Sequence, residues 1–266
     1  MLSRLVAFIN YLGKSGMEMV DDVVGMAGLL FDTLCAAAGT AKNLNASFSN
    51  QMSRQILYTG VEAFWLVGII AFLAGNTIIL QAMNNMPLFG VTEYFGNILV
   101  IAVVRELGPF FTALVVIGRS GAALAAHIGN MRVSREIAAL EVMGVDPVNY
   151  LVFPGLVGMI GSMICLNIYF DLIAIIGGLV VAKVTVDVPF LLFMGKVLEA
   201  LTTVDVLVSL GKSVVFGTII AIVSCHYGFK VKNIRGVPQA SIRAVVTSMT
   251  LIIVLNILVT IGYYAY

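Results

Sequence analysis

The sequence predicts an all-α integral membrane protein that crosses the membrane five times. Of its 266 residues, 60% are hydrophobic and 11% are charged, whereas a soluble domain has about 25% charged residues. The mean hydropathy is +1.04. The apolar runs are long and lack a period of two, which favours membrane helices over a membrane β-barrel. This composition excludes a disordered chain, a nucleic-acid-binding protein that works by bulk positive charge and an ordinary cytosolic enzyme.

The first fifty residues differ from the rest of the chain, and we expect them to form an interfacial region. Apolar side chains recur at helical spacing between positions 20 and 34, with Glu18, Asp22, Gly25 and Asp32 on the other face. This pattern indicates a helix that lies along the membrane surface. Its polar face lacks lysine and arginine, so docking on a protein partner stays a near-equal alternative.

Gaps between charged residues locate the five spans, because one helix needs about 20 apolar residues to cross the hydrocarbon core. Their expected ranges are 56–80, 95–126, 148–182, 204–228 and 244–266. We therefore predict one domain over residues 1–266. It comprises the interfacial region at 1–50 and a transmembrane region at 56–266.

The distribution of basic residues orients the chain, since cytoplasmic segments carry an excess of lysine and arginine. A cytoplasmic N-terminus leaves only Lys183 and Lys196 on the opposite side. It places ten basic residues in the cytoplasm: Arg4, Lys14, Lys42, Arg54, Arg132, Arg135, Lys230, Lys232, Arg235 and Arg243. An odd number of spans then puts the C-terminus outside.

The second span contains charged residues, which are costly in a membrane and usually face a bundle interior, a partner or a cavity. Arg105 and Glu106 are expected near its middle, and adjacent helical positions point about 100° apart. We expect each to find a partner elsewhere. One interpretation is a polar feature of a substrate path, and the other is a structural ion pair between helices, such as Lys212 with Asp171 or Glu106. Pro109 is expected to kink the span.

The connection between the second and third spans predicts a short amphipathic helix at 132–143. Val133, Ile137, Leu140 and Met143 fall on one face. Gly144 stands where a helix-ending glycine is expected, and Pro147 follows it. From spacing alone, a plain connecting helix is favoured over a docking helix.

No catalytic motif is visible. The sequence has no Walker A motif, no GxSxG, no HExxH and no Cys/His pairing at metal spacing. Cys35, Cys165 and Cys225 are scattered and are best interpreted as packing residues. We expect no catalytic residue, metal or cofactor in this chain, so any energy must come from a partner or an ion gradient.

Several ordered motifs make the sequence resemble one known family. They are Arg105-Glu-Leu-Gly-Pro109, Gly118-Arg-Ser-Gly121, Glu141-Val-Met-Gly-Val-Asp-Pro147, Lys212-Ser-Val-Val-Phe216 and Arg243-Ala-Val-Val-Thr-Ser248. The sequence resembles the MlaE (YrbE) permeases of ABC systems that move lipids with MCE-domain partners. The likeness covers nearly the whole chain.

The resemblance implies an assembly and a place in the cell. Members of this family form homodimers in the bacterial inner membrane, with two cytoplasmic ATPase subunits that use ATP and magnesium. A hexameric MCE protein stands above them in the periplasm, and some systems include a small STAS-type accessory subunit. The implied activity is movement of phospholipids between the inner membrane and the MCE protein, which supports outer-membrane lipid asymmetry. No nucleic acid is implied.

The resemblance also assigns site residues. The helix at 132–143 matches the family's coupling helix, which reverses the preference for a plain connector. The implied ATPase-coupling set is Arg132, Arg135, Glu136, Ile137, Leu140, Glu141, Met143, Gly144 and Asp146. The implied lipid pocket is bordered by Arg105, Glu106 and Leu107, and position and apolarity add Met83, Met86, Leu88 and Phe89.

Two positions depart from the family pattern. His127 stands where the family usually has glutamate, at the cytoplasmic end of the second span. The loop at 230–238 is more basic than is usual, which bears on contacts with the ATPase or an accessory subunit.

Two other classes stay open as alternatives. One is an ion-gradient-coupled secondary transporter, with Arg105, Glu106, Lys212 and Asp171 as a charge relay. The other is a membrane scaffold that recruits a soluble partner through its basic loops.

Overall fold

The computed structural model describes residues 21–33, 35, 46–85 and 96–264. Every regular element within these ranges is helical, which confirms the predicted all-α class. Five of these helices are long and apolar enough to cross a membrane, as predicted. They cover Ala63–Met83, Gly96–Val133, Val148–Thr185, Thr203–Phe229 and Ile234–Tyr263.

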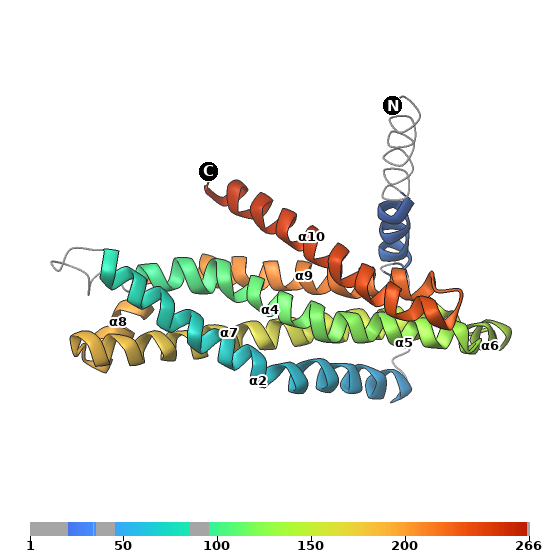
Figure 1. Cartoon of the computed structure of the whole chain (residues 1–266), viewed down its shortest axis with the longest axis horizontal. Helices are drawn as coiled ribbons and strands as arrows, with labels where there is room; N and C mark the ends of the chain where they lie inside the picture. Colours follow the sequence, from blue (N-terminus) through green and yellow to red (C-terminus); the bar gives the residue numbers. More distant parts are fainter. Residues whose placement is uncertain (1–20, 34, 36–45, 86–95, 265–266) are drawn as a thin grey trace, which may run out of the picture.

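The first and third spans pack closely along their length. Helix α2 (Ala46–Asn85) lies against α7 (Phe153–Val186) (Figure 1). Glycines allow this approach, because a Cβ atom on Gly177 would lie 2.5 Å from the Phe72 carbonyl oxygen of α2. Small residues at such contacts let two membrane helices come close enough for extensive van der Waals packing.

The second span is one continuous helical rod made of α-helical and wider π-helical turns. It runs through η1 (Val100–Leu107), α4 (Gly108–Val116), η2 (Ile117–Gly121) and α5 (Ala122–Val133). Pro109 lies in the first turn of α4, directly after the π-helical segment. A proline lacks the backbone N–H that an α-helix requires. The wider π-helical turns before Pro109 accommodate the missing N–H group, and the helix stays continuous.

The connection after the second span contains a shorter helix than predicted. Helix α6 covers only Glu136–Val142, because Arg135 adopts a left-handed conformation with φ of 60° and separates it from α5. Arg132 therefore belongs to the last turn of α5. The predicted end is confirmed at Gly144, whose φ is +75°. The N–H groups of Gly144 and Val145 bond back to Glu141 and Leu140, the pattern of a Schellman motif.

The second half of the molecule is organised around one central helix. After η3 (Val148–Val152) and α7 the chain forms α8 (Phe190–Ala200), a short helix that the sequence analysis did not predict. Helix α9 (Thr203–Phe229) then returns through the bundle, and η4 (Ile234–Gly236) leads into α10 (Val237–Tyr264). Figure 1 shows α6 and α8 at opposite ends of the bundle.

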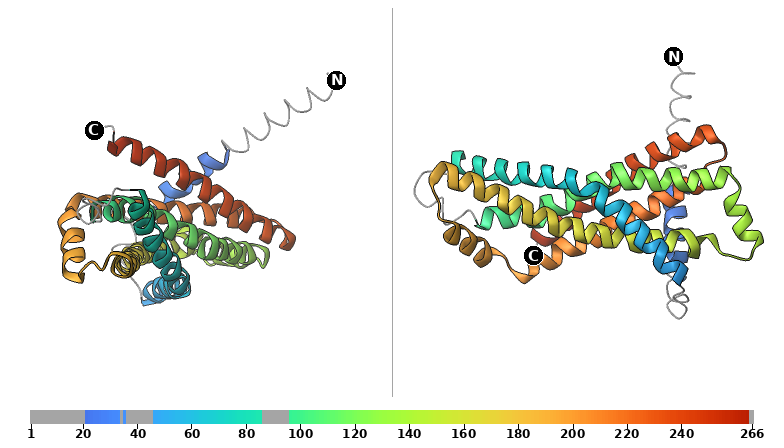
Figure 2. Two further views of the ribbon diagram at one scale, coloured as in Figure 1. Left: turned by 60° about the vertical axis from the view of Figure 1, so that its left-hand side comes forward. Right: turned by 90° about the horizontal axis from the view of Figure 1, so that it is seen from below.

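The interfacial helix, residues 21–33, lies across the bundle at the end where α6 is found (Figures 1 and 2). Asp22 and Gly25 of its predicted polar face pack on the bundle together with Met26, Leu29 and Leu30, whereas Asp32 of that face is exposed. Gly25 allows this approach, since a Cβ atom there would lie 2.5 Å from Cε1 of His226. The apolar face points outward, with Val24 65% and Phe31 66% exposed. An exposed apolar face on a crosswise helix is suited to a membrane surface.

Candidate functional site

Two ion pairs link the second span to α9 inside the bundle. We call Arg105, Glu106, Asp205 and Lys212 the charge cluster. The Arg105 guanidinium donates to Asp205 Oδ1 through Nε, at 3.0 Å, and through Nη2. The Asp205 side chain is 2% exposed, and Arg105 also stacks over the ring of Tyr263, 4.4 Å from its centroid. Arg105 is thus held by two helices at once.

The second ion pair neutralises Glu106. The Lys212 ammonium donates to Glu106 Oε2 at 2.9 Å, and the Thr260 hydroxyl donates to the same oxygen at 2.9 Å. Of the two predicted partners for Lys212, the structure therefore selects Glu106. The expectation that Arg105 and Glu106 do not pair with each other is confirmed, because each binds a different residue of α9.

Pro109 explains a third contact of the cluster. In an α-helix the N–H of residue 109 would bond to the carbonyl oxygen of residue 105, but proline has none. Lys212 Nζ donates to the Arg105 carbonyl oxygen instead, at 3.1 Å. A buried carbonyl group without a partner would cost about 1–3 kcal/mol. The ammonium group therefore completes the backbone of one helix and neutralises a carboxylate with the same atom.

The charge cluster lies nearer one end of the bundle than predicted. Asp205 occupies the first turn of α9, and Lys212 follows two turns later. This is the end opposite α6 (Figure 1). The expected position near mid-span was wrong, since the second span continues to Val133.

A second polar group lies deeper between α4, α7 and α9. Asn167 donates to the Ser209 hydroxyl at 2.8 Å. The Oδ1 atoms of Asn167 and Asp171 and the hydroxyl of Thr112 are buried without a hydrogen-bond partner among the described residues. Asp171 joins neither ion pair. The predicted relay is therefore not assembled as one connected chain.

The predicted lipid-binding residues are only partly placed. Leu107 is half-buried beside the charge cluster, and Met83 is half-buried near the end of α2. The Thr185 hydroxyl of α7 contacts Met83 Sδ at 3.1 Å. Met86, Leu88 and Phe89 lie outside the described residues. Arg105, Glu106 and Leu107 thus lie together on η1, whereas Met83 lies on α2 against α7.

The predicted coupling residues surround α6. Ile137 is 1% exposed and anchors the helix, with Leu140 half-buried beside it. Met143 is exposed at the tip, and so are the polar members Arg132, Arg135, Glu136, Glu141 and Asp146. Arg132 and Glu136 are four positions apart but form no ion pair among the described residues, because Arg135 interrupts the helix between them. The Asp146 carboxylate binds the backbone N–H of Val148 at 3.1 Å and begins the third span.

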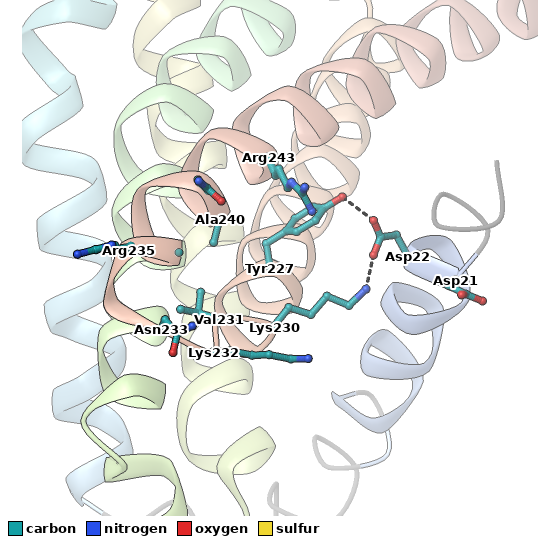
Figure 3. Close-up of a pocket in the computed structure, with 12 residues that line it drawn as sticks. Asp21, Asp22, Tyr227, Lys230, Val231, Lys232, Asn233, Arg235, Ala240 and Arg243 are labelled. Carbon is teal, nitrogen blue, oxygen red and sulfur yellow. Dashed lines mark hydrogen bonds and ion pairs between the residues drawn. The ribbon is translucent and has the colours of Figure 1, made fainter. Parts of the chain in front are cut away.

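Two functional groups escaped the sequence analysis. The first is Asp205, which forms with Thr202 the capping box that starts α9. A threonine followed three residues later by an acidic residue is a local signal from which this capping box could have been predicted. The second is the contact that docks the interfacial helix. Asp22 accepts hydrogen bonds from Lys230 and from the Tyr227 hydroxyl, the latter at 3.0 Å (Figure 3). It also accepts one from His226 Nε2 at 3.2 Å.

The environment of Asp22 favours its charged form. Partial burial alone would raise its pKa, but the hydrogen bonds from Lys230, His226 and Tyr227 outweigh it and lower the pKa of Asp22 below its ordinary value. Tyr227 and His226 come from the last turn of α9. A charged Asp22 therefore ties the interfacial helix to the same helix that carries Asp205 and Lys212.

Five apolar helices make this chain a multi-pass membrane protein. The model of the family described as Permease MlaE matches residues 52–261. The chain therefore belongs to the MlaE permease family, as the resemblance predicted. Members of this family are ABC transporter permeases, and such permeases work with ATPase subunits.

Named relatives agree with this placement. A probable ABC transporter permease of Rickettsia felis is 36% identical over 208 residues, which cover 78% of this chain and 80% of the relative. Another from Rickettsia bellii is 35% identical over 257 residues, or 96% and 97% of the two chains. The chloroplastic protein TRIGALACTOSYLDIACYLGLYCEROL 1 of Arabidopsis thaliana is 28% identical over 197 residues, covering 74% of this chain and 56% of that protein.

Proposed function

We propose that this chain is the membrane subunit of an ATP-driven transporter that moves phospholipids between a bacterial inner membrane and a periplasmic MCE protein. In this role it supports outer-membrane lipid asymmetry. The chain acts as a homodimer and hydrolyses nothing itself, because ATP and magnesium are used by the partner ATPase. A small STAS-type accessory subunit belongs to the same proposal.

The observation that carries this proposal is the exposed tip of α6. Ile137 fixes the helix to the bundle, while Val142 and Met143 at its end are 88% and 67% exposed. Figures 1 and 2 show α6 at the extreme end of the bundle, beyond the last turn of α5. An exposed apolar tip beside charged residues is suited to a groove on a partner protein. ATP-driven closure of two ATPase subunits would then move the two α6 helices of a dimer together.

A lipid cargo is supported by the apolar residue Leu107 beside the charge cluster and by one relative. The name of the Arabidopsis relative contains trigalactosyldiacylglycerol, a lipid with two acyl chains. The half-buried Leu107 lies beside the two ion pairs. A pocket that offers apolar walls and a few polar groups fits an amphipathic lipid. We propose that Arg105, Glu106 and Leu107 border the lipid site, with Met83, Met86, Leu88 and Phe89 continuing it.

The proposed orientation agrees with the arrangement of the helices. The interfacial helix, α6 and the loop before α10 lie at one end of the bundle, and α8 lies at the other (Figures 1 and 2). The basic residues Arg132, Arg135, Lys230 and Lys232 all belong to the first end. The positive-inside rule makes that end cytoplasmic. The N-terminus is then inside and the C-terminus outside.

The first test is native mass spectrometry of the full chain extracted gently from its own membrane. We expect two copies of the chain with two ATPase subunits, a ring of MCE subunits and bound phospholipid. A lone chain or a homodimer, under conditions that preserve other ABC complexes, would contradict the partner assignment. The gradient-coupled alternative would then require transport that follows an ion gradient without an ATPase.

The second test removes the coupling surface. The double variant Leu140→Asp with Glu141→Lys should lose ATPase association and ATP-dependent lipid transfer while the spans stay folded. The control Leu191→Asp with Glu199→Lys makes the same chemical changes on exposed residues of α8, at the opposite end. The control should retain its ATPase. Full ATP-dependent lipid transfer by the α6 variant would overturn the docking assignment.

A further inference from the structure

A pocket of about 600 Å³ lies between the interfacial helix and the loop that joins α9 to α10 (Figure 3). It is separate from the charge cluster, which lies near the opposite end of the bundle. Its walls include Asp21 and Asp22 of the interfacial helix, Tyr227 of α9, and the basic residues Lys230, Lys232, Arg235 and Arg243. The first turn of α10 closes it with Gln239 and Ala240.

The charges around this pocket do not balance. The carboxylate of Asp22 is occupied by Lys230, Tyr227 and His226. Asp21 also lines the pocket, but it forms no ion pair with the basic residues there within the described part of the chain. Lys232 and Arg243 are exposed and form no ion pair within the described part of the chain. Two cations are therefore available to a ligand.

The directions of the side chains single out these two cations. Figure 3 shows Lys232 extending toward the interfacial helix and Arg243 lying above Tyr227, so both border the same opening. Arg235 extends in the opposite direction from the loop (Figure 3). The first turn of α10 also lines the pocket and has no acidic residue, and helix N-termini favour anions.

We propose that this pocket binds a phosphate-bearing anion, with the headgroup of a phospholipid in the adjacent leaflet as its source. A guanidinium and an ammonium group are the side chains that proteins use for phosphate oxygens. The neighbouring interfacial helix exposes Val23, Val24 and Phe31, which suits contact with the same leaflet. The bound headgroup would hold the interfacial helix and the α9–α10 loop together. This site is independent of the transported lipid.

The test titrates the purified full-length chain in detergent with phosphatidylglycerol, using native mass spectrometry. Removing both cations, Lys232→Gln with Arg243→Gln, should weaken phosphatidylglycerol binding about tenfold, as expected for lost charge-assisted hydrogen bonds. Lys183→Gln is the control, because it removes an exposed cation of α7 that does not line the pocket. It should change the affinity by less than about twofold. Phosphatidylcholine, which has no net charge, should bind more weakly and respond less to the double variant.

A second variant keeps the test informative if the double variant unfolds. Gln239→Glu adds a negative charge to the pocket wall and removes no cation, and it should also weaken phosphatidylglycerol binding. If inorganic phosphate binds with the same dependence on Lys232 and Arg243 while phosphatidylglycerol does not, the anion site is supported and its source is free phosphate. Equal loss in Lys183→Gln, or unchanged binding in the double variant and in Gln239→Glu, would overturn the proposal.

Discussion

The substitution Lys212→Met tests whether the charge cluster stabilises the bundle. Methionine keeps the length and apolar stem of the side chain but removes the ammonium group. The side chain of Lys212 is 2% exposed, and its Nζ binds both Glu106 and the Arg105 carbonyl oxygen. The change therefore leaves a carboxylate and a carbonyl group without their main partner.

The expected loss follows from these contacts. Breaking a buried ion pair by removing one partner costs about 3–5 kcal/mol. The Glu106 side chain is 24% exposed and keeps its bond from Thr260, so water compensates part of the loss. We expect Lys212→Met to lower the free energy of unfolding by about 3 kcal/mol. Adding Glu106→Gln removes the unpaired charge and should recover about 2 kcal/mol. The single variant Glu106→Gln completes the double-mutant cycle that gives the coupling between the two sites.

The assay is reversible unfolding of the full chain in mixed detergent micelles, followed by far-ultraviolet circular dichroism. Lys183→Met is the control, because Lys183 is an exposed cation near the end of α7. It should change the stability by less than about 0.5 kcal/mol. The reasoning fails if Lys212→Met is as stable as the unmodified chain, or if Glu106→Gln makes the Lys212→Met variant less stable.

Three further predictions follow from local geometry. Gly108→Ala should lower the free energy of unfolding by about 1–3 kcal/mol through overpacking, because its Cβ would lie 3.0 Å from Asn167 Oδ1 and closer still to Asp171 Oδ1. The control Gly118→Ala meets nothing within 4 Å and should cost nothing in the same unfolding assay. Gly144→Val should lower the free energy of unfolding by about 1–2 kcal/mol, since a side chain is strained at φ of +75°. Hydrogen exchange in α6 should become faster, and Gly144→Asn should have the smaller effect. The docking of residues 21–33 should be fully stable above the ordinary pKa of aspartate and be lost as the pH falls from there through the lowered pKa of Asp22. Hydrogen exchange should show this change, and Asp22→Asn should remove the part of the pH dependence that Asp22 contributes.

The sequence was sufficient to predict the five spans because their signal is local. A run of about 20 apolar residues has one stable arrangement in lipid, where every backbone group must be bonded within its own helix. The end of α6 was predictable for the same reason, since Gly144 supplies a conformation that other residues adopt at a cost. Arg135 adopts a left-handed conformation without being glycine. No local pattern marks it, so the predicted helix at 132–143 was too long.

The partners of the buried charges were not predictable in the same way. Arg105 and Asp205 are 100 positions apart in the sequence, and Glu106 and Lys212 are 106 apart. The spacing of residues along the sequence does not identify such pairs, because they depend on how the helices pack against one another. The sequence therefore left two candidate partners for Lys212. The capping box at Thr202 and Asp205 is local, but its sequence does not show that Asp205 also binds Arg105. The amphipathic pattern of residues 21–33 likewise predicted a helix without showing that Asp22 faces the bundle.

Helix α9 connects the features that the sequence presents separately. Its first three turns hold Asp205 and Lys212, which neutralise the second span, and its last turn holds His226 and Tyr227, which bind Asp22. Between them its packing is close, because a Cβ atom on Gly217 would lie 3.0 Å from Ile160 Cα of α7. A helix fixed at both ends and packed tightly between them moves as a rigid unit, since close-packed interiors transmit displacement. Motion of the interfacial helix or its pocket is therefore expected to reach the charge cluster through α9. Asp22→Asn and Lys212→Met should accordingly each alter hydrogen exchange at the other end of this helix.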